Sequence, residues 1–161
     1  MTIEPLQIDE AEVLWEFLRI AAHEASVERV KSDPQLARYV ANWGRDGDFC
    51  ALAREGAAAI GACWARIFSL EEHGYGWISA EIPEISLAVR EEHQGSGVGR
   101  ALLENVIETA KALHLSLSLS VRLDNQAALQ LYRSCGFEEL APTKAANRSG
   151  TTSVTMLRFP N

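Results

Sequence analysis

The residues best suited to hold a charged ligand form a glycine-rich stretch, Gln94-Gly-Ser-Gly-Val-Gly-Arg100. Glycine permits positive φ and leaves room for a ligand to approach the backbone closely. The stretch lies between a strand-like segment and an amphipathic helical segment that begins near Gly99. Because the first N–H groups of a helix lack intrahelical acceptors and carry partial positive charge, this turn is suited to bind a phosphate.

Two common phosphate-binding motifs do not fit this turn. The dinucleotide fingerprint G-x-G-x-x-G needs a third glycine where the chain has Arg100 or, counted from Gly97, Leu102. A Walker A loop needs a Gly-Lys pair, and the turn has none. A nucleotide-binding α/β protein that uses the turn for another phosphate ligand stays an alternative.

The elements before this turn predict two helices and a hairpin. Residues 3–8 favour a strand, and Asp9 starts a capping-box pattern for a helix that extends to Ala21. Asp33-Pro34 matches an N-cap followed by proline, and apolar spacing predicts a second helix that ends at Gly44. An antiparallel hairpin follows, with strands at 49–54 and 57–68 and a turn at Glu55-Gly56.

Strands and helices alternate in the second half of the chain. Gly99, Leu102, Leu103, Val106, Ile107 and Ala110 give the clearest apolar helix face. The other predicted elements are a strand at 84–89, a strand at 115–121 with one buried face, a helix at about 125–134 that stops at Gly136, and strands near 137–140 and 153–159. This order predicts an α+β sandwich around one mixed sheet, in a single domain over residues 1–161.

Composition narrows the classes of function. Hydrophobic residues make up 47% and charged residues 23% of the chain, which favours a packed globule over disorder. The net charge of -7 and the lack of a basic patch argue against nucleic acid as a partner. Short apolar runs and the lack of an apolar leader predict a cytoplasmic protein with no membrane partner. The three cysteines and four histidines lack ligand spacing, so we expect no metal and interpret the cysteines as buried apolar residues.

Three short motifs together carry a resemblance to a known family. Gln94, Gly97 and Gly99 match the pattern [QR]-x-x-G-x-[GA]. Downstream, N-x-x-A-x-x-L-Y runs from Asn125 to Tyr132, and Cys-Gly-Phe follows it. Over residues 80–140 the chain resembles the GCN5-related N-acetyltransferase (GNAT) superfamily.

The resemblance implies a three-layer α/β/α sandwich around a mixed, mostly antiparallel sheet with a splayed parallel pair of central strands. It also implies acetyl-CoA as co-substrate, and the motif matches place its binding residues at Leu87, Ala88, Val89, Gln94, Gly95, Ser96, Gly97, Val98, Gly99, Arg100 and Asn125. The backbone at 87–89 would meet the pantetheine, with the side chains of Leu87 and Val89 in the core, and the amides of 94–100 would hold the pyrophosphate. Asn125 can equally be a plain N-cap, and Gln94 and Arg100 can equally be solvated surface residues.

The chemistry that the resemblance implies needs a base, an oxyanion site and an acid. An ammonium has no lone pair, so the acceptor amine must lose a proton, and a lysine-like amine has a pKa of about 10.4. Tyr132 lies where the family's general acid lies, with packing in the helix as the alternative. Glu84 is the candidate base, with an exposed strand-end carboxylate as the alternative, and Glu81, His73 or water are other options. A backbone N–H near Val89 is the candidate oxyanion donor.

We therefore expect an N-acetyltransferase that transfers acetyl from acetyl-CoA to a primary amine of a small molecule or peptide, directly in a ternary complex. The alternative is a non-catalytic acyl-CoA-binding or sensing module on the same fold. The resemblance also makes a homodimer possible. The acceptor is not specified by any motif.

Overall fold

The structure is a computed structural model that describes residues 1–140, 145–146 and 152–161. Its residues group into two compact units, Met1–Arg66 with Ile85–Val106, and Ile67–Glu84 with Ile107–Asn161. The strand β4 (Glu84–Val89) and the helix α4 (Val98–Ala112) each contribute residues to both units.

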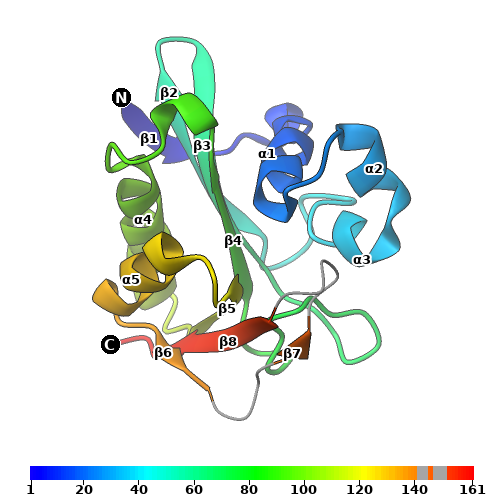
Figure 1. Ribbon diagram of the computed structural model, residues 1–161, viewed down its shortest axis with the longest axis vertical. Coiled ribbons are helices and arrows are strands. Elements are labelled where there is room, and N and C mark those ends of the chain that lie inside the picture. The colour runs from blue at the N-terminus through cyan, green and yellow to red at the C-terminus, as the bar shows by residue number, and fades with distance from the viewer. Residues whose placement is uncertain (141–144, 147–151) are drawn as a thin grey trace. The chain divides into compact units, whose positions relative to one another are not determined.

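The first unit contains β1 (Thr2–Pro5), β2 (Phe49–Glu55) and β3 (Ala58–Arg66), followed by most of β4 in the order β1-β2-β3-β4. The helices α1 (Val13–Ala22), α2 (Val27–Ser32) and α3 (Pro34–Ala37) lie on one side of these strands, and α4 lies on the other (Figure 1). The predicted hairpin is confirmed, because β2 and β3 pair antiparallel. The strands therefore form a layer between two layers of helices.

In the second unit, β8 (Thr152–Arg158) is the central strand. It pairs antiparallel with β5 (Leu117–Arg122), β6 (Glu138–Glu139) and β7 (Ala145–Ala146). The first residue of β4, Glu84, pairs in parallel with Ser118 of β5. The helix α5 (Gln126–Ser134) follows β5. The α+β class, the mixed sheet and its parallel β4–β5 pair are confirmed.

The predicted helix over residues 34–44 is too long. Ser26 and Asp33 cap two separate short helices, α2 and α3, by accepting from the N–H groups of Arg29 and Gln35. The helix α3 ends at Ala37, and hydrogen-bonded turns continue to Ala41.

Arg66 of β3 lies fully buried beneath this segment, with 1% of its side chain exposed. Its guanidinium binds both carboxylate oxygens of Asp48, at 3.0 and 2.8 Å. It also donates to the carbonyls of Arg38 and Ala41, at 3.0 and 2.6 Å. The backbone after α3 therefore follows the positions of these donors, which a pattern of apolar residues does not encode.

Three smaller expectations also change. Asp9 does not cap α1, because residues 8–10 form the 3₁₀ helix η1 (Ile8–Glu10) and α1 begins at Val13 without a side-chain cap. The strand predicted at 115–121 begins at Leu117 and is buried on both faces at first, because Ser118 is 0% exposed. Cys50 and Cys63 are buried as expected, but Cys135 is only half-buried.

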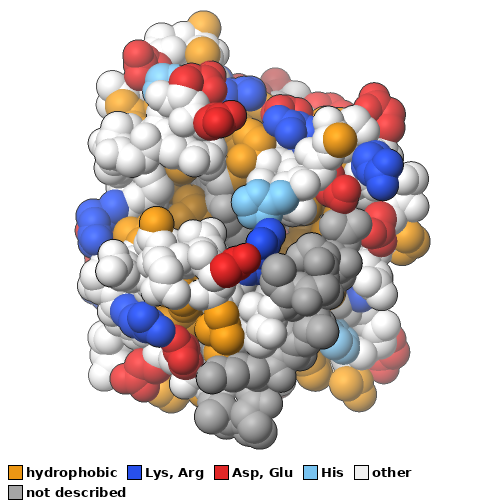
Figure 2. Space-filling model, in the orientation of Figure 1, with side chains coloured by type: hydrophobic (Ala, Val, Ile, Leu, Met, Phe, Trp, Pro, Cys, Tyr) orange, Lys and Arg blue, Asp and Glu red, His pale blue; other side chains and the backbone are white. Residues whose placement is uncertain are grey.

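The apolar face of α4 is confirmed, because Leu102, Leu103, Val106, Ile107 and Ala110 are all 5% exposed or less. Among the described residues no helix combines the length and apolar character needed to span a bilayer. On the face that Figure 2 shows, acidic and basic side chains are interspersed in small groups. The buried face of α4 thus holds the helix against the core, and its first turn includes the last residues of the glycine stretch.

Candidate active site

The glycine turn links β4 to α4 through the short 3₁₀ helix η2 (Glu91–His93). Gly95 has φ +77° and Gly97 has φ +90°, and a Cβ built on either would meet no atom within 4 Å. The positive φ explains the glycines, since other residues rarely adopt it. The residues from Gln94 to Gly97 are exposed, so their backbone is open to a ligand.

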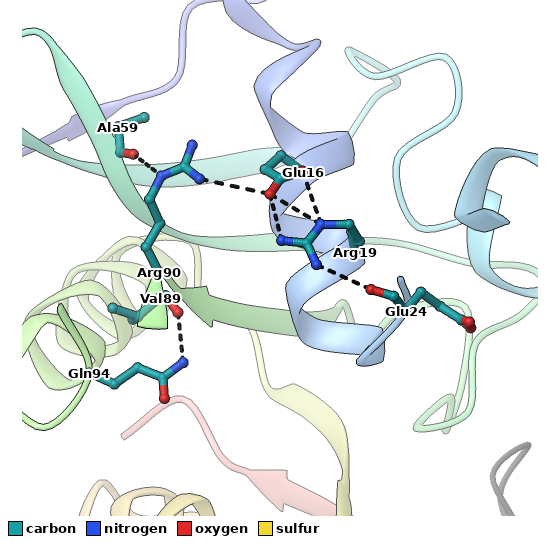
Figure 3. A network of polar contacts seen from close by, with 7 residues as sticks. All are labelled: Glu16, Arg19, Glu24, Ala59, Val89, Arg90 and Gln94. Atoms are coloured by element: carbon teal, nitrogen blue, oxygen red, sulfur yellow. Dashed lines mark hydrogen bonds and ion pairs between the residues drawn. The ribbon is translucent and has the colours of Figure 1, made fainter. Parts of the chain in front are cut away.

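The side chains of the turn hold its own backbone. Gln94 Nε2 donates to the carbonyl of Val89 at 2.9 Å, which ties the turn to the last residue of β4 (Figure 3). Ser96 Oγ donates to the carbonyl of His93 at 2.6 Å. Gln94 is thus an exposed residue whose side-chain amide supports the turn.

The first turn of α4 lies directly after these glycines. Val98 is buried and anchors the helix. Gly99 is half-buried and Arg100 is exposed. Arg100 lies 3.8 Å from Glu104 one turn later, and 47% of its side chain is exposed. The N–H groups at the start of a helix carry partial positive charge, so this end of α4 favours a phosphate.

Gly61 of β3 allows this helix end to approach the sheet, and the sequence motifs did not identify it. A Cβ at Gly61 would lie 2.9 Å from Leu102 Cδ1, 3.3 Å from Val98 Cγ1 and 3.2 Å from the carbonyl oxygen of Ala88. The only signal in the sequence is an isolated glycine inside a strand, which is typical of a close approach of two backbones. Gly61 therefore fixes the depth at which α4 begins.

The side chains of β4 differ from the expectation. Ala88 is buried, but Leu87 and Val89 are only half-buried, so they are not core residues. At this end of β4 the small side chain of Ala88 packs in the interior, and the longer side chains of Leu87 and Val89 stay partly accessible to solvent. Leu87, Ala88, Val89 and the turn at 94–100 all belong to the first unit.

Glu84 is one of the few buried charged residues in the described part of the chain, at 3% exposed. Its strand neighbour Ser118 is 0% exposed, and the N–H of Ser118 donates to the carbonyl of Pro83 at 3.0 Å. The interpretation of Glu84 as an exposed strand-end carboxylate is therefore wrong. By contrast, Glu81 and His73 are exposed, and the His73 ring stacks on Trp77 at 4.8 Å. Burial of a carboxyl is common at catalytic sites.

Tyr132 lies on α5 and Asn125 directly precedes it, and both belong to the second unit, as does Glu84. Tyr132 is 8% exposed and packs edge-on against Phe137, with ring centroids 5.8 Å apart. Asn125 is exposed and caps α5, because its Oδ1 accepts from the N–H of Ala128 at 3.2 Å. The N-cap interpretation of Asn125 is thus confirmed, and its amide nitrogen stays a candidate for the cofactor arm.

The buried thiols are poor nucleophiles. Burial raises the pKa of Cys50, and burial together with the neighbouring Cys50 raises the pKa of Cys63. A thiol held protonated in this way reacts slowly, because the thiolate is the reactive form. Among the described residues no group of three or more His, Cys, Asp or Glu is arranged to hold a metal ion.

Comparisons with known sequences agree with the motifs. The family model described as "Acetyltransferase (GNAT) family" matches residues 12–137. The N-alpha-acetyltransferase RimI of Mycobacterium tuberculosis is 39% identical over 74 residues, which is 45% of this chain and 46% of that protein. The [ribosomal protein bS18]-alanine N-acetyltransferase of Escherichia coli K12 is 47% identical over 55 residues, which is 34% of this chain and 37% of that protein. The chain thus spans less than half the length of these curated relatives.

Solved structures share the fold over nearly the whole chain. The putative acetyltransferase yncA of Salmonella typhimurium, solved with its cofactor acetyl-CoA, has a TM-score of 0.72 at 22% identity, covering 100% of this chain and 94% of that one. The ribosomal-protein-alanine N-acetyltransferase of Brucella melitensis has a TM-score of 0.73 at 21% identity, with 99% of each chain covered. With the family model matched over residues 12–137, the chain belongs to the acetyltransferase (GNAT) family.

Proposed function

We propose that this chain is an N-acetyltransferase that transfers an acetyl group from acetyl-CoA to a primary amine. The observation that carries the proposal is the exposed turn between β4 and α4, where Gly95 and Gly97 leave open space beside a helix N-terminus. These features fit a diphosphate, because backbone N–H groups and the helix dipole both favour an anion there. Gln94 to Arg100 would hold the diphosphate, and the backbone of Leu87 to Val89 would meet the pantetheine.

The acceptor that we favour is the α-amine of a peptide, with a small-molecule amine as the other possibility. The names of the relatives from M. tuberculosis and E. coli support this choice, since both refer to α-amine or alanine acetylation. Proton chemistry supports it as well. An α-amine has a pKa of about 7.7 to 8.0 and a lysine amine about 10.4, so near neutral pH an α-amine is deprotonated far more readily.

In the proposed reaction the neutral amine attacks the thioester carbonyl in a ternary complex. A C–N bond forms, the C–S bond breaks, and the electron pair of that bond leaves on the sulfur of CoA. Glu84 takes a proton from the amine, directly or through water, and Tyr132 donates a proton to the departing thiolate. A backbone N–H near Val89 stabilises the oxyanion. Because a thiol has a pKa of about 8.5 and a tyrosine about 10, this proton transfer is uphill by about 1.5 pKa units, a difference small enough for tyrosine to act as the acid.

The test combines an acceptor panel with one variant pair. Mass spectrometry follows acetylation of an alanine-starting peptide, of the same peptide with a blocked N-terminus and an internal lysine, and of a small polyamine. We expect the free N-terminus to be acetylated fastest. Tyr132→Phe should lower turnover by a factor on the order of 10² to 10⁴, the usual contribution of a general acid. Tyr39→Phe is the matched control, because it also removes a buried tyrosine hydroxyl.

The outcomes separate the candidate functions. Binding of acetyl-CoA without acetylation of any amine would favour the acyl-CoA-binding module. A thermal-shift series with acetyl-CoA, NAD and ATP tests the nucleotide-binding alternative, because a ligand at about 100 times its Kd adds about 2.7 kcal/mol of stability. Equal loss of turnover in Tyr132→Phe and Tyr39→Phe would remove Tyr132 from the mechanism.

A further inference from the structure

Arg90 is the first residue after β4 and directly precedes η2, which leads to the glycine turn. Its backbone N–H donates to the carbonyl of Ile60 at 2.9 Å, and its Nε donates to the carbonyl of Ala59 at 2.7 Å. Its own carbonyl accepts from the N–H of His93 at 2.9 Å, which closes η2. One residue thus joins two successive carbonyls of β3 to the 3₁₀ helix that precedes the turn.

The other side of the Arg90 guanidinium faces α1. Its Nη1 lies 3.8 Å from Glu16 Oε1 (Figure 3). Its Cζ lies 5.3 Å from the centre of the Phe17 ring. Glu16 is held in place by Arg19, whose nearest nitrogen is 2.6 Å away, and Arg19 Nη1 donates to the carbonyl of Glu24 at 3.1 Å. The guanidinium therefore lies between a strand, an aromatic ring and an anchored carboxylate.

Electrostatic stability alone does not account for this arrangement. The side chains of Arg90 and Glu16 are 33% and 31% exposed, and partly exposed ion pairs at such distances contribute little to the free energy of unfolding. What the contacts specify is orientation, because a planar guanidinium bonded at Nε and flanked on its other edge has one allowed direction. The backbone of Arg90, bonded to Ile60 and to His93, joins this oriented side chain to η2 and so to the turn at Gln94.

We infer that Arg90 is a positioning residue for the diphosphate-binding turn, which it fixes to β3 and, through Glu16, to α1. The inference rests on the proposed function, because it takes the turn to be the diphosphate site. Arg90 makes no contact with ligand in this role. Its effect is confined to ligands that carry the diphosphate, since it acts by holding the backbone of 94–100 in its binding geometry.

The test compares acetyl-CoA with acetyl-pantetheine, which lacks the diphosphate together with the 3′-phosphoadenosine attached to it. Kd is measured for acetyl-CoA and for acetyl-pantetheine with the unaltered chain, Arg90→Met, Arg90→Lys and Glu16→Gln. We expect Arg90→Met to weaken acetyl-CoA by about 2- to 30-fold, the range of coupling found for residues that act through others, and to leave acetyl-pantetheine unchanged. Arg90→Lys should recover part of the loss, since it keeps the charge without the planar fork. Arg29→Met, which removes an arginine charge that is 70% exposed, is the matched control.

Each outcome decides between the inference and its alternatives. Unchanged acetyl-CoA affinity in Arg90→Met, or equal weakening of both ligands, would overturn the positioning role. If the unaltered chain itself bound both ligands equally, the proposed diphosphate site would fail first, and the inference with it. Glu16→Gln keeps the test decisive should Arg90→Met not fold, because it leaves the Arg90 bonds to Ala59 and Ile60 in place. A smaller, diphosphate-dependent loss in that variant supports the inference, and no loss contradicts the link to α1.

Discussion

Replacing Gly97 with alanine should separate backbone strain from steric blocking in the turn. Gly97 has φ +90°, and no atom lies within 4 Å of where its Cβ would be. The new methyl group therefore clashes with nothing in the protein, and the cost is that of a left-handed conformation for an L-residue, about 1 to 2 kcal/mol. The turn either retains its shape at that cost in stability or relaxes to a different backbone path.

The expected loss of affinity follows from the hydrogen bonds at stake. A hydrogen bond to a charged group contributes about 1.5 to 3 kcal/mol net. If the relaxed turn loses one amide bond to the diphosphate, the Kd for acetyl-CoA rises by about 10- to 150-fold. Retention of the native backbone would instead lower the free energy of unfolding and leave affinity less affected. Calorimetric titration and chemical denaturation of the same protein distinguish these two cases.

Gly56→Ala is the matched control for Gly97→Ala. Gly56 lies between β2 and β3, has φ +61°, and also has open space around a built Cβ. Gly56→Ala should lower the free energy of unfolding by a similar amount without changing the Kd for acetyl-CoA. The strain argument predicts that Gly97→Ala loses either affinity or stability. It is refuted if the variant keeps its circular dichroism spectrum, binds acetyl-CoA within about twofold of the unaltered chain, and has an unchanged free energy of unfolding.

Two further predictions concern stability. A Cβ at Gly76 would lie 2.4 Å from the backbone carbonyl carbon of Leu119 and 2.6 Å from the backbone nitrogen of Ser120. Gly76→Ala should therefore lower the free energy of unfolding by at least about 1 to 3 kcal/mol. An unchanged midpoint in chemical denaturation would contradict that packing. Glu16 has a lowered pKa, chiefly because Arg19 donates a hydrogen bond to it, so its contribution to stability is present above the unfolded pKa of about 4.3 and is lost as pH falls. The stability difference between the unaltered chain and Glu16→Gln should therefore narrow from about pH 5 to pH 3, and a pH-independent difference would show that the carboxylate charge is not responsible.

Local features of the sequence account for the predictions that hold. The glycines at 95 and 97 predict positive φ in the turn, and the apolar spacing from Leu102 to Ala110 predicts the buried face of α4. Asn125 predicts its own cap, and the Glu55-Gly56 turn predicts the hairpin. Each of these depends on residues within about one or two turns of one another, so spacing along the chain is sufficient to reveal them.

The sequence by itself thus determined the β2–β3 hairpin, the helices α4 and α5, and the turn that is the candidate diphosphate site. Only the tertiary structure decided that Glu84 is buried, that Gly61 admits the start of α4, and that Arg90 joins β3 to α1. It also ended α3 early, through Arg66. These contacts join residues far apart in sequence, and their partners are fixed by how strands and helices pack against each other, which no local spacing records.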